Sequence, residues 1–320
     1  MDDTFISKNW MYFSIYFIIF IIFSVLLMYY NGYINAKMIR SIITKKIDKG
    51  NNRYVFDELN HDIDYNRYII DRSTDNEFYN IVKKTKLQIK STYKNVVLIT
   101  SKIIVSNNVF SYTKTRSIYS TEQRLSQTKN TIKTIREKIP NVCIFLIDNS
   151  EFNDRYEYIN EELENICDVF INPVNNIELN YYTNVNKYKS IAEAYQIIYF
   201  LDLFNKLDII YDQFFKISGR YYINNTFNYN NYVTDKIIFA NDKNLDFMYC
   251  YTSFYMIPSL KFNSYFNAYK VIYNNRHNEK LVEQNIEYIL PMLLKVKNIK
   301  IVTNLGITQI IAVTNEISNI

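Results

Sequence analysis

From Asn95 onward, short apolar runs alternate with longer amphipathic segments, and this alternation limits the possible folds more than any other feature of the sequence. The run that begins at Asn95 and the run Val142–Asp148 are rich in Val, Ile and Phe and have the length of strands. Between them, Ser120 and Gln123 form a capping-box pattern, which predicts a helix over Thr121–Ile139. Alternating strands and helices are typical of an α/β domain with a mostly parallel central sheet.

The same alternation continues through the rest of the chain. It predicts helices over Tyr156–Ile166, Lys187–Asn205 and Lys280–Lys295, and strands over Asp168–Pro173, Gln213–Ile223, Lys236–Ala240 and Phe247–Ile257. Residues 94–320 are therefore predicted to form one α/β domain, a length that a single domain accommodates.

The N-terminal part of the chain has a different character. After a tail over residues 1–9, the 21 residues Trp10–Tyr30 carry no charge, enough for a helix to cross a bilayer. A cleaved signal peptide is the alternative, but its apolar region is shorter. Lysines and arginines follow the span, which predicts a single-pass protein with its C-terminal domain in the cytoplasm. We interpret the charged residues 31–93 as a juxtamembrane stem, with an extra helical layer on the main domain as the alternative.

Composition excludes several classes of function. Only 4 of the 320 residues are glycine, and neither a glycine-rich dinucleotide fingerprint nor a P-loop is present. Two His and three Cys, all far apart, exclude zinc fingers and a disulfide scaffold. The net charge of +5 is mild and is not concentrated on one predicted face, so a nucleic-acid partner is not expected.

Candidate ligand-binding residues lie where the predicted strands end. Ligands of open α/β sheets bind beyond the carboxyl ends of the strands, which here are occupied by Thr100, Ser101, Asp148 and Ser150. A carboxylate such as Asp148 accepts hydrogen bonds from a ribose or a base, or it caps the turn that follows its own strand. The sequence leaves both interpretations open.

The segment Lys216–Tyr221 is the most distinctive one. It places Ser218 and one of the few glycines, Gly219, between Lys216 and Arg220. A ligand could therefore approach the backbone closely and bind to the two cationic side chains. The alternative is a solvated turn in which the glycine only satisfies backbone geometry.

Helical acids are the candidates for a general base, which requires a carboxylate within hydrogen-bond reach of an acceptor hydroxyl. Glu287 is the first choice and Glu193 the second. Lys189 is a further candidate substrate-binding residue, and the resemblance described next adds Arg116.

Several of these segments resemble a family of glycosyltransferases found in giant viruses and bacteria. The resemblance covers about residues 95–315. It is carried by Arg116, Ser120, Glu122, Arg124, Gln127, Thr128, Pro140, Asp148 and Ser150, by the Lys-x-Ser-Gly-Arg-Tyr segment at Lys216–Tyr221, and by Tyr251–Pro258 and Asn304–Val313. The AT-rich codon bias implied by the many Ile, Asn, Lys and Tyr residues is compatible with a viral source.

This resemblance implies the GT-A fold, a Rossmann-like nucleotide-sugar-binding fold, and transfer of a sugar from a nucleotide-sugar donor to a glycan, protein or lipid acceptor. In that family the first strand and the Asp after the second strand hold the nucleoside. Ser218-Gly219-Arg220 stands where the family has a metal-binding Asp-x-Asp, which puts a Mn²⁺ or Mg²⁺ cofactor in doubt. Our hypothesis is that Lys216 and Arg220 neutralise the diphosphate instead. A non-catalytic membrane protein on a degenerate GT-A scaffold is the alternative.

Overall fold

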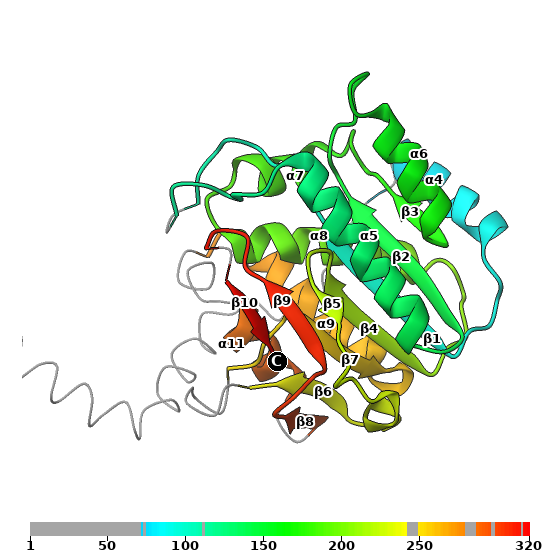
Figure 1. Cartoon of the computed structure of the whole chain (residues 1–320). Helices are drawn as coiled ribbons and strands as arrows, with labels where there is room; N and C mark the ends of the chain where they lie inside the picture. Colours follow the sequence, from blue (N-terminus) through cyan, green and yellow to red (C-terminus); the bar gives the residue numbers. More distant parts are fainter. Residues whose placement is uncertain are drawn as a thin grey trace, which may run out of the picture. The chain divides into compact units, whose positions relative to one another are not determined.

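The structure is a computed structural model that describes residues 72, 75–110, 113–241, 249–278, 286–295, 298–314 and 316–320 (Figure 1). The predicted membrane span Trp10–Tyr30 and most of the predicted stem lie outside these residues. No helix within the described ranges is long and apolar enough to cross a bilayer.

A seven-stranded sheet forms the centre of the domain. Its strands are β1 (Asn95–Ser101), β2 (Val142–Asp148), β3 (Val169–Ile171), β4 (Gln213–Ser218), β6 (Ile237–Ala240), β7 (Phe254–Pro258) and β8 (Ile299–Val302). Their order in space is β3-β2-β1-β4-β7-β6-β8. The strands β3, β2, β1 and β4 are parallel, as predicted, whereas β7 is antiparallel to both of its neighbours.

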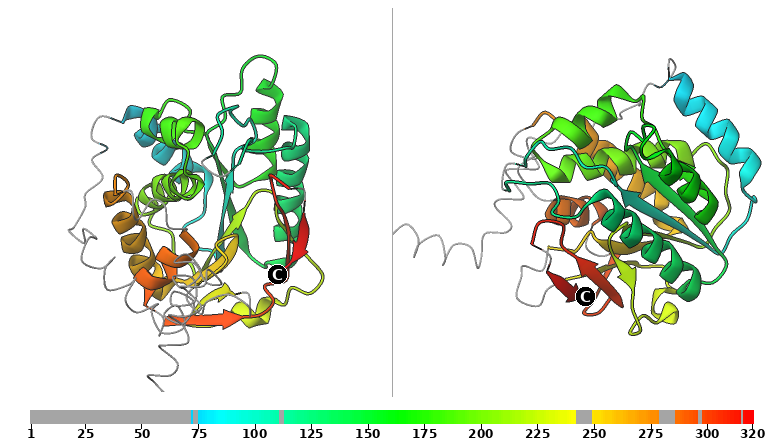
Figure 2. Two further views of the ribbon diagram at one scale, coloured as in Figure 1. Left: turned by 90° about the vertical axis from the view of Figure 1, so that its left-hand side faces the viewer. Right: turned by 45° about the horizontal axis from the view of Figure 1, so that its top comes forward.

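Helices cover both faces of this sheet (Figure 2). They are α4 (Asn76–Gln88), α5 (Thr121–Lys138), α6 (Glu157–Ile166), α7 (Ile177–Asn180), α8 (Lys189–Phe204), α9 (Phe262–Asn274) and α11 (Ile286–Leu294). Shorter helical turns are η1 (Tyr181–Val185), η2 (Tyr229–Tyr232) and η3 (Ser259–Lys261). The capping box of α5 is present, with Ser120 and Gln123 each bonding the other's backbone N–H.

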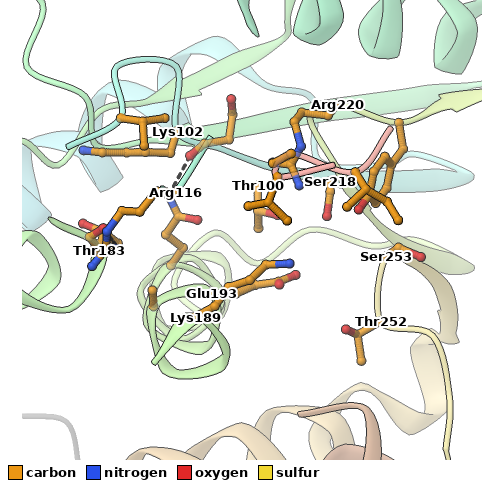
Figure 3. Close-up of a pocket in the computed structure, with 18 of the residues that line it drawn as sticks. Thr100, Lys102, Arg116, Thr183, Lys189, Glu193, Ser218, Arg220, Thr252 and Ser253 are labelled. Carbon is orange, nitrogen blue, oxygen red and sulfur yellow. Dashed lines mark hydrogen bonds between the residues drawn. The ribbon is translucent and has the colours of Figure 1, made fainter. Parts of the chain in front are cut away.

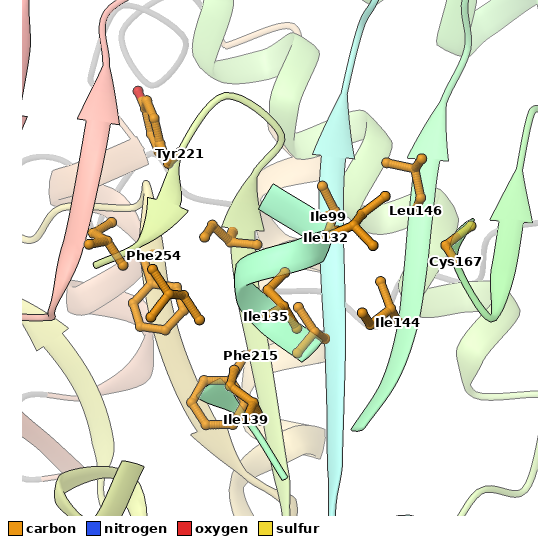
Figure 4. Close-up of a cluster of buried hydrophobic side chains, with 14 of the residues drawn as sticks. Ile99, Ile132, Ile135, Ile139, Ile144, Leu146, Cys167, Phe215, Tyr221 and Phe254 are labelled. Atoms are coloured by element: carbon orange, nitrogen blue, oxygen red, sulfur yellow. The ribbon is translucent and has the colours of Figure 1, made fainter. Parts of the chain in front are cut away.

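Successive residues of each strand point alternately into two hydrophobic cores, one on each face of the sheet. Val97 and Ile99 of β1 pack with Ile132 and Ile135 of α5 in a cluster that Figure 4 shows in part. On the opposite face, the Phe145 ring of β2 lies 5.3 Å from that of Phe200 in α8. Burial on both faces explains why the parallel strands read as continuous apolar runs rather than as alternating ones.

Part of the predicted stem packs onto this domain. The Phe78 side chain of α4 is buried, and its ring lies 5.6 Å from that of Tyr199 in α8. Arg72 Nε donates a 2.7 Å hydrogen bond to Asp202, also in α8. For the described residues 72 and 75–88, these are the contacts expected if this part of the chain forms an extra helical layer on the main domain.

A small second sheet completes the domain. It has the order β10-β9-β5 and consists of β5 (Tyr222–Ile223), β9 (Ile307–Ile310) and β10 (Ile317–Asn319). Gly306 enters β9 with φ +72°, and a Cβ there would lie 2.3 Å from the Phe227 backbone, so only glycine fits. The sequence predicts that Gln213–Ile223 is a strand that runs into a turn. The strand β4 ends at Ser218, and after the turn Tyr222 and Ile223 belong to this second sheet.

Candidate functional site

A pocket lies at the carboxyl ends of β1 and β4 (Figure 3). The chain runs from β1 outward through β2 and β3, then returns to place β4 on the other side of β1. The order of strands therefore reverses between β1 and β4, and such a switch point is where open α/β sheets bind ligands. The pocket brings together Thr100, Ser101, Arg116, Lys189, Glu193, Ser218, Arg220 and Glu287 from the predicted site residues.

Four cationic side chains line the part of the pocket next to the sheet ends and α5. They are Lys102, Arg116, Arg124 and Arg220. Burial, together with the charges of Arg116 and Arg124, lowers the pKa of Lys102 to about 8 despite the opposing effect of Asp148. Burial and Arg220 lower the pKa of Arg124 to about 9. Because these cations disfavour one another's charge, an anion bound among them would relieve the repulsion.

Arg116 also joins two walls of the pocket. Its side chain is only 6% exposed, and its Nε and Nη1 donate 2.7 and 2.8 Å hydrogen bonds to the carbonyls of Asn108 and Thr183. Its Nη2 donates to the carbonyl of Asn186. The guanidinium thus ties the β1–α5 loop to the region of η1, a π-helical turn, and such turns are frequent at functional sites.

The opposite side of the pocket carries carboxylates. Glu193 of α8 accepts a hydrogen bond from Lys216 Nζ, and the Lys216 side chain is fully buried. Lys216 also donates to Ser218 Oγ at 3.3 Å and to the carbonyl of Thr252 at 2.9 Å. Burial opposes ionisation of Glu193, but the charges of Lys216 and Lys189 outweigh it and lower the pKa of Glu193.

Glu287 of α11 has the opposite shift. Its carboxylate accepts a 3.2 Å hydrogen bond from Thr252 Oγ1. Burial raises the pKa of Glu287, and the charge of Glu193 raises it further. Two carboxyl groups whose surroundings move their pKa values apart are suited to different roles in proton transfer.

Four predicted site residues do not line the pocket, namely Asp148, Ser150, Lys216 and Gly219. Asp148 is fully buried, and its two oxygens accept 2.8 Å hydrogen bonds from the N–H groups of Ser150 and Ile103. Ser150 is equally buried and accepts from the N–H of Ile104 at 2.9 Å. These are the bonds of the turn-capping interpretation of Asp148. Both residues fix the loops after β1 and β2, and their contact with a ligand stays a prediction.

The structure corrects the expectation for Lys216 and adds a packing role for Gly219. Lys216 lies beneath the pocket and is bonded to Glu193, so it is not placed to bind a diphosphate directly. Gly219 is buried, and a Cβ on it would lie 3.1 Å from Ser101 Cβ and 3.2 Å from Thr128 Oγ1. Close packing against β1 and α5 is a physical reason for a glycine here, and the approach of a ligand to its backbone stays a prediction. Arg220 does line the pocket, as predicted.

Two of the four cations were missed as site residues in the sequence. Arg124 lies on the polar side of an amphipathic helix, where arginines are normally solvated, yet it is 5% exposed and donates 2.7 Å from Nε to the carbonyl of Lys102. Lys102 follows directly after β1, and that position at a strand end was the available signal. The C-terminal residues Ile311, Ala312 and Val313 also line the pocket.

The residues of this pocket do not suit a divalent metal. Where Asp-x-Asp is expected the chain has Ser218, Gly219 and the cationic Arg220, and Mg²⁺ or Mn²⁺ prefers several carboxylate oxygens. Glu193 is already bonded to Lys216. Within the described ranges, no group of three His, Cys, Asp or Glu side chains is arranged to hold a metal ion.

Comparison with known proteins gives limited similarity. No protein-family profile and no curated protein match the sequence. Among solved structures, the glycosyltransferase GlyE of Streptococcus pneumoniae TIGR4 matches with 12% identity and a TM-score of 0.39, over 66% of this chain and 45% of GlyE. A nucleoside-diphosphate-sugar pyrophosphorylase from Vibrio cholerae RC9 matches with 10% identity and a TM-score of 0.41, over 67% of this chain and 95% of the other. Similarity this low supports no statement about function.

Proposed function

We propose that this protein is a glycosyltransferase that uses a nucleotide-sugar donor. The observation that supports the proposal is the cluster of Lys102, Arg116, Arg124 and Arg220 around a pocket at the β1/β4 switch point. A diphosphate is an anion that matches such a cluster, because guanidinium groups bind phosphate oxygens through paired hydrogen bonds.

The chemistry would proceed by displacement at the anomeric carbon. The bond from this carbon to the diphosphate breaks while the acceptor oxygen bonds to it, and the cations stabilise the charge that accumulates on the leaving group. If the anomeric centre is inverted, a carboxylate must take the proton of the acceptor hydroxyl. Glu287 is our first candidate, because it lines the pocket and its raised pKa favours proton acceptance near neutral pH.

Nucleotide binding tests the proposal most directly. At a ligand concentration near 100 times Kd, UDP, GDP or CMP should stabilise the full-length chain by about 2.7 kcal/mol, read as a thermal shift. Arg220→Ala should weaken that shift while leaving the far-UV circular dichroism unchanged. The absence of a shift with every nucleotide would leave the non-catalytic scaffold as the better description.

The proposed reaction does not depend on a divalent metal, since Arg220 stands in place of an Asp-x-Asp carboxylate. Sugar transfer should therefore continue in EDTA. Activity that EDTA abolishes and Mn²⁺ restores would contradict this part of the proposal.

A non-catalytic membrane-anchored protein on a degenerate GT-A scaffold is the second candidate, and the replacement of Asp-x-Asp by Ser218-Gly219-Arg220 favours it. The two candidates differ in turnover. A panel of nucleotide sugars with water or a mixed glycan, protein and lipid fraction as acceptor would release free nucleotide only if the protein is an enzyme.

Membrane anchoring through Trp10–Tyr30 remains part of the proposal. Resistance of the full-length chain to extraction by alkaline carbonate, and extraction of a chain that starts at residue 63, would support it. A truncated chain should not start as late as Asn95, because that would remove α4, whose Phe78 is buried against α8.

A further inference from the structure

The pocket has two chemically different sides, which come from opposite faces of the sheet. Lys102, Arg124 and Arg220 lie at the ends of β1 and β4 and on α5. Glu193 and Glu287 come from α8 and α11, on the other face. Figure 3 shows Arg220 and Glu193 on different sides of the same space. A ligand that fills the pocket must therefore meet cations at one end and carboxylates at the other.

Glu193 has a lowered pKa and is bonded to Lys216 through one of its two oxygens. Lys216 Nζ donates to Oε1, and no group within the described part of the chain donates to Oε2. The side chain is 19% exposed, and Glu193 lines the pocket. An ionised carboxylate with an open oxygen accepts hydrogen bonds from hydroxyl groups, and such charge-assisted bonds are the stronger class.

A second acid, Glu287, also lines this side of the pocket. Glu287 is close enough to Glu193 for the two charges to disfavour each other, which is one reason that the pKa of Glu287 is raised. Among the described residues, the cations that favour the ionised form of Glu193 are Lys216, which is bonded to it, the exposed Lys189 at the start of α8, and Arg220. An ionised ligand carboxylate has no proton to donate to Glu193 and would face its negative charge, whereas a ligand hydroxyl would donate a hydrogen bond.

We propose that the transferred sugar is an uncharged hexose whose hydroxyl groups bind Glu193, and that this side of the pocket discriminates against uronic and sialic acid donors. The inference rests on the proposed function, since it requires the donor's diphosphate to lie against the cations. It adds the chemical class of the sugar and names Glu193 as the residue that determines the specificity.

A matched pair of donors tests this inference. UDP-glucose and UDP-glucuronate differ only in a hydroxymethyl group against a carboxylate at C6, and GDP-mannose and GDP-mannuronate form the same pair for guanine. The full-length chain, with mild detergent present because of its apolar segment, should bind the neutral member of the accepted pair at least tenfold more tightly by calorimetry, equivalent to about 1.4 kcal/mol. In Glu193→Gln the ratio should fall towards one.

Control variants separate specificity from folding. Glu193→Gln leaves Lys216 buried without its acid, so Glu193→Gln/Lys216→Met provides a variant without the unpaired charge, and it should show the same loss of discrimination. Glu161→Gln changes an exposed acid of α6 outside the pocket and should keep the wild-type ratio.

The outcomes of this experiment are distinct. Equal binding of both members by the wild type overturns the inference while leaving the proposed function intact. Preference for the acidic member, abolished by Lys189→Ala, also overturns it and identifies Lys189 as the partner of a sugar carboxylate. Failure to bind UDP, GDP, CMP or any nucleotide sugar overturns the proposed function and the inference together.

Discussion

Replacing Lys216 by Met removes a fully buried ammonium group from beneath the pocket. In the wild type this group donates hydrogen bonds to Glu193, Ser218 and the carbonyl of Thr252. The variant leaves the Glu193 carboxylate, 19% exposed, without its cation. Breaking a buried ion pair from one side costs about 3–5 kcal/mol of unfolding free energy, because the remaining charge stays desolvated. For a domain as long as residues 94–320, this loss should lower the melting temperature by about 6–20 °C.

The cost should depend on pH in a defined direction. The pKa of Glu193 is lowered from the ordinary value of 4.5, so the wild-type pair contributes stability above that pH. The contribution is lost as the pH falls through the folded-state pKa and the carboxylate is protonated. The difference in stability between wild type and Lys216→Met should therefore be full at pH 7 and should shrink once the pH falls below the ordinary value of 4.5.

Urea unfolding followed by circular dichroism at 222 nm measures both effects. The double variant Lys216→Met/Glu193→Gln should recover most of the lost stability, because replacing both members of a buried pair is often neutral. Lys129→Met serves as the control, since it breaks an exposed pair with Glu162, with side chains 45% and 32% exposed, and should cost about 0.5 kcal/mol or less. A loss below about 1 kcal/mol for Lys216→Met at pH 7, or a loss that does not change with pH, would refute the reasoning.

Three further predictions concern the pocket and α5. Nucleotide affinity should fall as the pH rises through about 8, where Lys102 loses its proton and its attraction for an anion, and calorimetry on Lys102→Met should show no such step. Gly219→Ala should destabilise the protein by about 1–2 kcal/mol in urea unfolding, because its Cβ would crowd Ser101 and Thr128; a gain in stability would show that the site relaxes freely. Ser120→Ala should cost about 1 kcal/mol in the same assay by removing the capping box of α5, and an unchanged midpoint would mean that tertiary contacts alone hold this helix end.

Local signals in the sequence predicted much of the α/β order. The strand Val142–Asp148 has the predicted bounds, and α5 ends at Lys138, one residue before the predicted end. Each of these local signals depends on residues a few positions apart, such as Ser120 and Gln123 at the start of α5. The helix α9, Phe262–Asn274, was not predicted, because its many Phe and Tyr residues favour strands locally. Its Phe262, Tyr265 and Tyr269 are buried against the sheet, and this tertiary burial outweighs the local preference.

The site divides in the same way. The positions of Thr100, Ser101, Ser218 and Arg220 at one edge follow from strand ends that can be read in the sequence. The partners of the charged side chains cannot be read there. Lys216 and Arg220 are both cations of one short segment, yet Lys216 meets an acid of α8 and is buried beneath the pocket, whereas Arg220 lines the pocket.

The sequence by itself therefore determined the order of the elements from β1 to β4, except for the short turns α7 and η1, and the edge of the sheet at which a ligand can bind. Only the tertiary structure decided the direction of β7, the burial of Arg124 and the pairing of Lys216 with Glu193. The physical reason is that burial and charge pairing depend on groups from separate elements, and Lys216 and Glu193 are 23 residues apart. Alternation, capping and strand ends, in contrast, depend on neighbours within a few residues along the chain.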